Sequence, residues 1–324
     1  MQPNLDEIKQ PIENELKIFE EKFRMAMKTK TPLLDAVLKY IVRQKGKRVR
    51  PMFVFLSASV AGEISEATYR GAALIELLHT ATLVHDDVVD DSNERRGFFS
   101  INAIWKNKIA VLVGDYLLSK GLLLAIDNKD FNLLEIVSNA VREMSEGELL
   151  QIEKTRKLNI SEEVYFEIIR QKTASLISSA CAIGAASANS EKLMTERMKL
   201  FGEKVGIAFQ IKDDLLDFGY EDTGKPHGID LKEKKITLPL IFSLNNSTYG
   251  ERRNIINKIR RQTQDQKTIA EVISFIYKKG GMKYAQEKML HYRTEALSLL
   301  NGLPEKKSLQ SLRDLVYFTT ERTK

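Results

Sequence analysis

The chain contains 324 residues, of which 43 % are hydrophobic and 29 % charged, with only 17 glycines and 7 prolines. This composition is typical of a globular protein and excludes collagen-like, low-complexity and disulfide-scaffold chains. The single cysteine, Cys181, excludes an intrachain disulfide and a cysteine-rich metal site, and it favours a reducing compartment. The net charge of +6 comes from basic clusters separated by long mixed stretches, without a zinc-finger or RNP pattern, so we expect no nucleic-acid partner.

Helical periodicity dominates the chain. Helix starts are marked at Thr31-Pro32 and at Ser161, and clear runs of strand periodicity are absent. The breaks between helices are short, and the longest irregular segment, 219–235, is a candidate active-site loop. No linker divides the chain, so the sequence predicts about a dozen helices in one all-α domain over residues 1–324. Apolar residues recur at i, i+3 and i+4 in segments 33–44, 69–86, 110–126, 131–144 and 198–217.

One segment, residues 173–190, carries no charge and is rich in Ser, Ala and Gly. It is only weakly apolar, so we expect a buried helix packed closely against its neighbours and not a membrane span. We expect no strongly apolar run of membrane-spanning length elsewhere, and the N-terminal MQPNLDEIKQ lacks the features of a secretory signal. These observations predict a cytoplasmic protein without an integral membrane span.

Two acidic motifs each end an apolar helical run. The first, DDVVD, spans residues 86–90, and the second, DDLLD, spans residues 213–217. In a helix, positions i and i+4 share a face about 6 Å apart along the axis, so the first and last aspartates of each motif point the same way. Such clusters destabilise the C-terminal end of a helix unless cations bind them. Two solvated helix ends are the alternative, but the pattern favours sites for hard cations, chiefly Mg²⁺.

Basic residues accompany both motifs and indicate what the cations bind. The string GKRVRP (46–51) precedes an apolar run, and NERRG (93–97) follows the first acidic motif. Arginine binds phosphate oxygens in bidentate fashion and lysine supplies a point charge. Acids and bases interleaved around two metal motifs therefore favour a Mg²⁺–diphosphate site. Single lysines also flank the other elements: Lys172, Lys212, Lys225 and Lys235.

Over nearly its whole length the chain resembles the trans-isoprenyl diphosphate synthases, or polyprenyl synthetases. One departure is Lys45, which replaces the first glycine of the usual pair before Lys47. The resemblance implies an all-α isoprenoid-synthase bundle around a central substrate cavity, usually a homodimer, that extends an allylic diphosphate by successive additions of isopentenyl diphosphate. The matching strings are GKRVRP (46–51), LIELLHTATLVHDDVVDDSNERRG (74–97), NKIAVLVGDYLLS (107–119), EGELLQI (146–152), KTASLI (172–177), GIAFQIKDDLLDF (206–218), GKPHGIDLKEKKITLPLI (224–241) and the C-terminal FTTERTK.

The resemblance also assigns roles to the motif residues. The Mg²⁺ ligands, for roughly three ions per site, would be Asp86, Asp90 and Asp213. Outer contacts or metal-bound water would be held by Asp87, Asp91, Asp214 and Asp217. The allylic diphosphate would lie at Arg95, Lys172, Lys212 and Lys225, and isopentenyl diphosphate at Lys47, Arg50, His79 and Arg96. The oxygens that face the allylic cation would belong to Thr173 and Gln210, and the tail residues that close over the homoallylic site would be Arg322 and Lys324.

The implied chemistry needs no acid–base pair. Mg²⁺, Lys and Arg stabilise the charge that develops on the departing diphosphate. The allylic carbon ionises, the double bond of isopentenyl diphosphate attacks the cation, and a proton is then lost to the departing diphosphate. Dry apolar surroundings protect the cation from water.

Product length depends, in this family, on the side chains that precede the first motif. Ala81 and Thr82 are small, with Leu78 one turn further back, where short-chain members carry bulky aromatics that block the tunnel. The first motif also lacks the two-residue insertion of many short-chain bacterial members. One helical turn of about 5.4 Å roughly matches an extended isoprene unit, so we expect an all-trans product of roughly C30–C50, a quinone side-chain precursor made from farnesyl diphosphate or a similar primer. Candidate floor residues of the tunnel are Phe131, Leu134 and Met144.

Several other enzymes and proteins share part of this pattern. A shorter-chain geranylgeranyl or farnesyl diphosphate synthase shares the motifs and remains the main alternative. A head-to-head synthase or a terpene cyclase lacks GKRxRP-like strings, and a non-catalytic partner subunit loses its acidic motifs. A di-iron carboxylate bundle needs Glu-x-x-His pairs, which the four histidines do not supply. The sequence therefore favours a prenyl-elongating enzyme and leaves its exact chain length and primer open.

Overall fold

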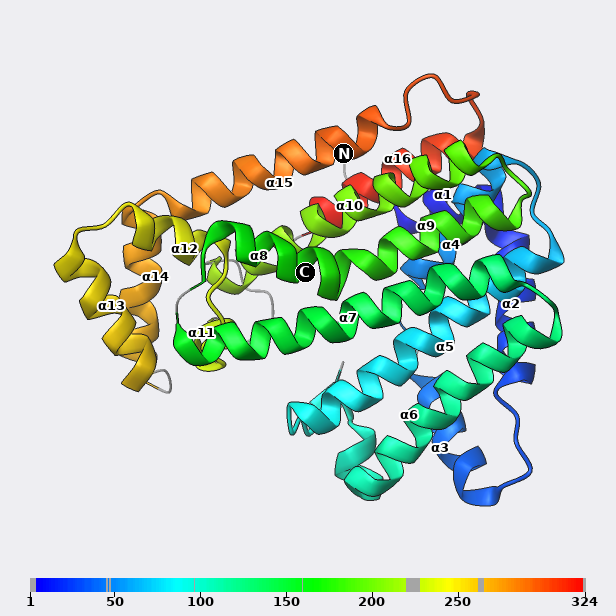
Figure 1. The fold of residues 1–324 in the computed structure, drawn as a ribbon, viewed down its shortest axis with the longest axis horizontal. Coiled ribbons are helices and arrows are strands. Elements are labelled where there is room, and N and C mark those ends of the chain that lie inside the picture. Colours follow the sequence, from blue (N-terminus) through cyan, green and yellow to red (C-terminus); the bar gives the residue numbers. More distant parts are fainter. Residues whose placement is uncertain are drawn as a thin grey trace.

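The computed structural model describes residues 4–44, 46, 48–95, 97–158, 160–219, 228–261 and 265–322. Helices make up nearly all of its regular structure (Figure 1), so the predicted all-α class is confirmed. In chain order the elements are α1 (Leu5–Lys9), η1 (Gln10–Ile12), α2 (Glu13–Ala26), α3 (Pro32–Arg43), α4 (Val49–Ala61), α5 (Glu66–Val89), β1 (Glu94–Arg95), β2 (Phe98–Phe99), α6 (Ile101–Asp127), α7 (Phe131–Lys157), α8 (Glu162–Ile169), η2 (Arg170–Ala174), α9 (Ser175–Ser187), α10 (Lys192–Phe218), α11 (Ile229–Lys232), α12 (Leu238–Asn245), α13 (Tyr249–Arg261), α14 (Gln266–Lys278), α15 (Gly281–Ser298) and α16 (Lys307–Thr320).

A short hairpin follows the first acidic motif. Strands β1 and β2 pair antiparallel, with Glu94 opposite Phe99, and Gly97 adopts the positive φ of +76° at the turn between them. Strands of two residues are too short to show an alternating hydropathy pattern, so the sequence did not predict them.

Helix α9 is the central helix of the bundle and lies buried between α4 and α10. Glycines allow the close approach on both sides. A Cβ at Gly184 would lie 2.3 Å from the carbonyl oxygen of Val54 in α4, and one at Gly202 in α10 would lie 2.6 Å from that of Ile177. The predicted buried, closely packed helix is thus confirmed. Cys181 of the same helix is fully buried, which raises the pKa of its thiol to about 12.

The buried side chains form two cores that meet along α10. The larger core joins the N-terminal half of α10 to α2, α4, α5, α6, α9 and α16. The smaller core joins its C-terminal half to α8 and to α12, α13, α14 and α15. Helices α13 and α14 pack on α12 and form one end of the molecule (yellow, left in Figure 1). The C-terminal end of α10, which carries the second acidic motif, therefore belongs to the smaller core, while the rest of the helix extends into the larger one.

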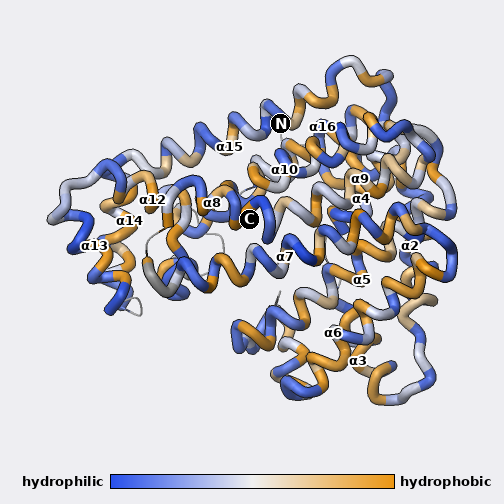
Figure 2. The backbone as a smooth tube through the Cα atoms, in the orientation of Figure 1, coloured by the Kyte–Doolittle hydropathy of each residue, from blue (hydrophilic) through white to orange (hydrophobic). Residues whose placement is uncertain are grey.

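Helix α6 corrects one expectation from the sequence. A window within Ile101–Asp127 has a mean hydropathy of 1.9 and is long and apolar enough to cross a membrane, with 33 % of it buried. The expectation that no apolar run reaches this length was therefore wrong. One side of α6 packs along α5, and Figure 2 shows its largely hydrophobic character. The apolar side chains that remain exposed are Ile104, Val111, Leu112, Leu123 and Ile126.

Candidate active site

The first acidic motif occupies the last turn of α5. Asp90 caps the helix and is exposed, and its amide donates a hydrogen bond to the carbonyl oxygen of Asp86 at 2.8 Å. Asp87 is buried, and the amide of Asn102 holds its backbone by donating to its carbonyl oxygen at 3.2 Å. Because the helix dipole is negative at this end, the two outer carboxylates lie where a bound cation stabilises the helix most.

The second acidic motif occupies the last two turns of α10. Asp213 forms an ion pair with Arg322, which follows α16 near the C-terminus, so the chain end reaches this motif. A carboxylate oxygen of Asp217 accepts a hydrogen bond from the amide of Asp230 at 3.2 Å. This bond brings the loop after α10 back onto the motif and places the carboxylate of Asp230, which the sequence did not single out, next to the predicted metal ligands.

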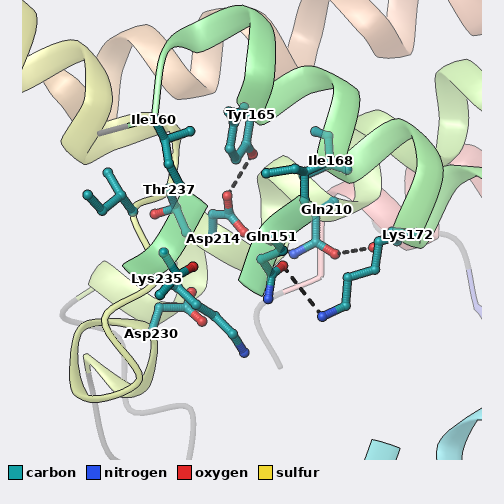
Figure 3. A pocket seen from close by; sticks show the side chains of 14 residues that line it. Gln151, Ile160, Tyr165, Ile168, Lys172, Gln210, Asp214, Asp230, Lys235 and Thr237 are labelled. Carbon is teal, nitrogen blue, oxygen red and sulfur yellow. Dashed lines mark hydrogen bonds between the residues drawn. The ribbon is translucent and has the colours of Figure 1, made fainter. Parts of the chain in front are cut away.

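A chain of hydrogen bonds links Tyr165 of α8 to the two residues predicted to face the allylic cation (Figure 3). The hydroxyl of Tyr165 donates to Asp214 Oδ2 at 2.6 Å, and Gln210 Nε2 donates to Asp214 Oδ1 at 3.0 Å. The hydroxyl of Thr173 then donates to Gln210 Oε1 at 2.8 Å. Because the Thr173 proton is used by Gln210, the threonine presents only oxygen lone pairs to the space in front of it.

Thr173 and Lys172 lie in η2, a five-residue π turn between α8 and α9. Two glycines fit against this turn. A Cβ at Gly147 of α7 would lie 2.9 Å from the amide nitrogen of Lys172, and one at Gly206 of α10 would lie 2.5 Å from Ala174 Cα. The widened helical turn is therefore held between two closely approaching helices, and such turns are frequent at functional sites.

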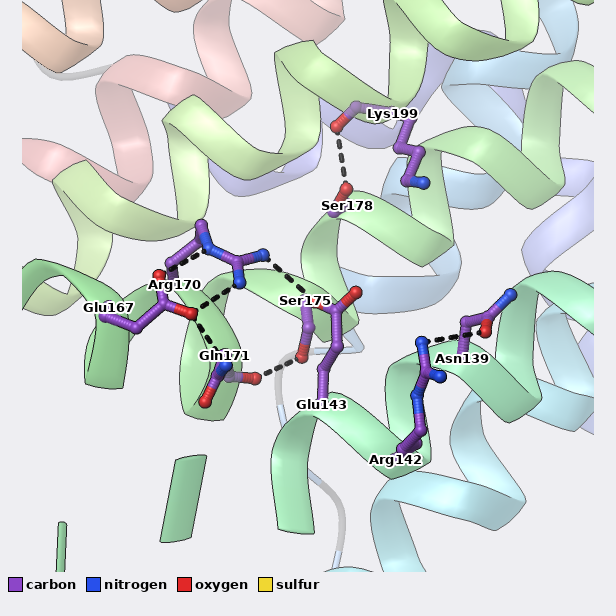
Figure 4. Close-up of polar contacts among 9 residues, drawn as sticks. All are labelled: Asn139, Arg142, Glu143, Glu167, Arg170, Gln171, Ser175, Ser178 and Lys199. Carbon is purple, nitrogen blue, oxygen red and sulfur yellow. Dashed lines mark hydrogen bonds and ion pairs between the residues drawn. The ribbon is translucent and has the colours of Figure 1, made fainter. Parts of the chain in front are cut away.

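Arg170 and Lys172 attach the same turn to α7. Arg170 pairs with Glu143 at 3.2 Å and with Glu167 at 2.8 Å (Figure 4). The ammonium group of Lys172 pairs with Glu148 and lies 3.4 Å from Gln151 Oε1. This places a lysine charge beside the hydrogen-bonded chain of Tyr165, Asp214, Gln210 and Thr173.

The hydrogen-bonded chain of Tyr165, Asp214, Gln210 and Thr173 and the neighbouring Lys172 line a cavity of about 230 Å³. Ile160, Ile168 and Ile236 supply apolar walls, and Lys172, Asp214, Asp230 and Lys235 supply charge (Figure 3). The mixture is suited to a diphosphate at one end and a hydrocarbon at the other.

The charges in and around the cavity perturb one another. Burial and the charge of Asp217 raise the pKa of Asp230 to about 7. Burial also raises the pKa of Asp214 well above its usual range, helped by the charge of Asp230. Burial alone would lower the pKa of Lys235, but its hydrogen bond to Glu233 and the charges of Asp230 and Asp90 raise it instead. Lys235 thus interacts with the first motif and with the loop beside the second.

The acidic cluster fits cations that are shared with a substrate. Among the described residues, no three carboxylate, histidine or cysteine side chains form a complete metal-binding group. Mg²⁺ is usually held by one or two carboxylates, several waters and substrate phosphates. The two motifs, with the raised carboxylate pKa values near the second, have the donor set for that arrangement, in which bound cations would relieve the repulsion between the acids.

The predicted isopentenyl diphosphate residues are described only in part. Arg50 lies half-buried in the first turn of α4, and His79 is buried in α5. Arg48, with φ +54°, donates to Glu76 Oε2 at 2.7 Å and lies 5.3 Å from the ring of Phe23. This pair joins the start of α4 to α5 one turn before His79. Outside the described residues lie Lys47, Arg96, Lys225 and Lys324, and the same holds for the side chain of Arg95.

The predicted chain-length residues follow one face of α5 back from Asp86. Leu78 and Ala81 are buried, and Thr82 is half-buried with its hydroxyl bound to the carbonyl oxygen of His79 at 2.9 Å. Of the candidate floor residues, Phe131 is 61 % exposed at the start of α7 and does not close a tunnel within one chain. Leu134 and Met144 are partly buried against the larger core, so they stay the candidate floor residues.

Sequence reasoning missed Tyr165 and Asp230 and left Lys235 without a role. Tyr165 follows helical spacing in an apolar run, so its pattern is that of a core aromatic, and only the bond to Asp214 distinguishes it. Asp230 and Lys235 lie in the irregular segment 219–235, which the sequence did predict as a candidate active-site loop. Lys235 is among the lysines that the sequence singles out, and the acidic side chain of Asp230 in the same loop is the signal for the second residue.

Comparisons with known proteins identify the family of the chain. The chain is 36 % identical over 315 residues to the all-trans-nonaprenyl-diphosphate synthase (geranyl-diphosphate specific) of Rhodobacter capsulatus, covering 96 % of each chain. Its structure resembles a decaprenyl diphosphate synthase from the same organism (TM-score 0.93, 32 % identity, 99 % and 100 % of the two chains). It also resembles a polyprenyl synthase of Caulobacter crescentus CB15 complexed with calcium and isoprenyl diphosphate (TM-score 0.92, 31 % identity, 100 % and 99 % of the chains). The polyprenyl synthetase family model matches residues 31–276. The chain therefore belongs to the polyprenyl synthetase family.

Proposed function

We propose that this protein condenses an allylic diphosphate with successive isopentenyl diphosphates and makes a long all-trans polyprenyl diphosphate of roughly C30–C50. The observation that carries the proposal is the cavity at the second acidic motif, with Lys172 and Lys235 on its walls and the hydrogen-bonded pair Thr173–Gln210 beside them. The charge of Asp90 in the first motif acts on Lys235 of the same wall. Relatives named nonaprenyl and decaprenyl diphosphate synthases support the long product. We propose that the protein acts in the cytoplasm.

The proposed mechanism assigns each group to one part of the substrate. The ammonium groups of Lys172 and Lys235 attract the diphosphate and stabilise the negative charge that it gains as the allylic C–O bond breaks. Lone pairs of Thr173, fixed by Gln210, face the positive charge that appears on the allylic carbon. Isoleucines on the wall exclude water from that cation. The double bond of isopentenyl diphosphate then forms the new C–C bond, and a proton leaves to an oxygen of the departing diphosphate.

We propose Mg²⁺ as the cofactor, held by Asp86 and Asp90 on one side and by Asp213 on the other. When bound, it would neutralise diphosphate charge and lower the barrier to ionisation. The similar polyprenyl synthase of Caulobacter crescentus, which was crystallised in complex with calcium and isoprenyl diphosphate, supports a divalent cation at this site.

We also propose that two copies pair through α6. Leu112 and Leu123 on its outer side are 56 % and 52 % exposed, and large exposed apolar side chains that share one helix face mark an interface. A homodimer mass in solution by light scattering is expected. A monomer at micromolar concentration would contradict this arrangement.

The test of function is a product-length assay. Purified protein with Mg²⁺, farnesyl diphosphate and radiolabelled isopentenyl diphosphate should yield a ladder that ends at about six to ten isoprene units. In Ala81→Phe, the aromatic ring should block the path along α5 and end the ladder earlier, while the first addition continues. That retained first addition is the internal control for folding. A parent ladder that stops at four units or fewer would keep the reaction class and favour the shorter-chain alternative.

A further inference from the structure

The net positive charge of the protein is concentrated at one end of the molecule. Residues 249–279, which span α13 and α14, contain eight lysines or arginines and three aspartates or glutamates, a net charge of +5 against +6 for the whole chain. Figure 1 places these two helices at the tip beyond α12, and Figure 2 shows hydrophilic residues along α13.

The acids of this tip are already used by neighbouring groups. Glu251 pairs with Lys279 at 2.9 Å, and Glu271 pairs with Lys258. Asp265 caps α14, accepting hydrogen bonds from the amides of residues 267 and 268. Within the described part of the chain, no ion pair is formed by the remaining arginines of α13, which are Arg252, Arg253, Arg260 and Arg261.

Three of these arginines lie away from the core, and Arg252 in the first turn is half-buried. Ile255 and Ile259 are the buried residues of α13 and fix which side of the helix faces the protein. Arg253 and Arg260 are seven residues apart, two helical turns, so they share one outward face, and both are exposed, as is Arg261. Tyr249, at the start of the same helix, is 80 % exposed. Arginine beside an exposed aromatic is the composition of a helix that lies at a charged lipid interface.

The tip is also joined to the cavity. A Cβ at Gly228 would lie 2.6 Å from Ile269 of α14, so α14 packs directly against the start of the loop that carries Asp230 and Lys235. A membrane or other partner that bound α13 and α14 would therefore lie close to the part of the cavity that is lined by Asp230 and Lys235.

We propose that α13 docks the enzyme on an anionic phospholipid bilayer, with Arg252, Arg253, Arg260 and Arg261 binding lipid phosphates and Tyr249 entering the headgroup layer. The proposal adds to the function above, because a polyprenyl product with a long apolar tail partitions into a membrane. Each basic residue near an anionic bilayer strengthens partitioning about fivefold. These four arginines are therefore sufficient for reversible binding that weakens with salt.

Binding is measured by sedimentation with vesicles of phosphatidylcholine alone and with vesicles that contain phosphatidylglycerol. The patch variant is Arg252→Gln, Arg253→Gln, Arg260→Gln and Arg261→Gln together. The matched control removes the same four charges from scattered exposed positions on α2, α3, α10 and α15: Lys17→Gln, Lys39→Gln, Lys192→Gln and Lys283→Gln.

We expect the parent and the scattered variant to bind the anionic vesicles, and the patch variant to bind at least about 30-fold more weakly. None should bind the neutral vesicles, and all three should elongate farnesyl diphosphate in solution. Equal binding by the patch variant and the parent, or no binding by the parent, would overturn the proposal. Patch-dependent binding of duplex DNA in preference to vesicles would also overturn it and assign the surface to nucleic acid. Because vesicle binding is measured without substrates, these results are independent of whether the proposed reaction occurs.

Discussion

Tyr165→Phe removes a single oxygen from the hydrogen-bonded chain beside the cavity. The hydroxyl donates to Asp214 at 2.6 Å, and burial together with the charge of Asp214 raises the pKa of Tyr165, so it remains a donor throughout the assay range. Without it, Asp214 loses the bond to Oδ2 and keeps the bond that Gln210 donates to Oδ1. The side chain of Gln210, and with it the hydroxyl of Thr173, is then free to reorient.

The size of the effect follows from these contacts. Leaving a buried polar group without its partner costs about 1–3 kcal/mol, and the loss should lower Tm by about 2–4 °C in a protein of this size class. The oxygens of Thr173 and Gln210 act on charge that appears only in the transition state. We therefore expect kcat to fall about tenfold, a cost of about 1.4 kcal/mol. KM for both diphosphates should change less than twofold, because Lys172 and Lys235 are untouched.

Tyr284→Phe is the matched control. Its hydroxyl also donates to a carboxylate at 2.6 Å, that of Glu162, but it does not line the cavity. Steady-state kinetics with farnesyl and isopentenyl diphosphates, and melting curves, are measured for both variants. If kcat of Tyr165→Phe equals that of the parent, or falls only as much as in Tyr284→Phe, the positioning argument is wrong.

Three further perturbations test other contacts. Gly147→Ala should push η2 away from α7 and cost about 1–3 kcal/mol of stability together with most of the activity, whereas a Cβ at Gly250 meets nothing within 4 Å and Gly250→Ala should be harmless; equal melting temperatures would contradict this. Because burial raises the pKa of Asp230 from 3.8 to about 7, the parent loses stability as pH rises from about 4 to 7, and the loss is complete above 7. Metal-free Asp230→Asn should thus gain on the parent over that interval and stay ahead by about 4 kcal/mol at pH 8, and denaturation showing a pH-independent difference would rule this out. Arg322→Ala removes the ion pair between Arg322 and Asp213, so calorimetric titration should show several-fold tighter Mg²⁺ binding to the substrate-free protein; unchanged affinity would mean that the pair does not compete with the metal.

The helical fold and the site differ in how far the sequence predicts them. The uncharged composition of residues 173–190 predicts a buried helix, and both acidic motifs fall at the helix ends where periodicity ends. The π turn at Lys172 and Thr173 was not predictable, because it depends on Gly147 and Gly206, which approach from two other helices.

Contacts between side chains of different helices were likewise not predictable from the sequence. Tyr165 has the pattern of a core residue, and only tertiary packing brings its hydroxyl to Asp214 in α10. The pairing of Arg322 with Asp213 joins positions 109 residues apart, and helical periodicity carries no information at that range. Periodicity over residues 110–126 predicts the helix α6, but which of its apolar side chains remain exposed depends on which side packs against α5.

Helix α9 has a practical consequence for spectroscopy. Its Cys181 is the only cysteine of the chain, is fully buried, and has a thiol whose pKa is raised to about 12. Thiolate is the species that reacts with maleimides and nitroxide reagents, so the native protein is a background that these labels leave unmodified. A cysteine introduced at position 249 would take a single probe at the tip of the molecule, and its fluorescence or spin mobility would report directly on the surroundings of α13.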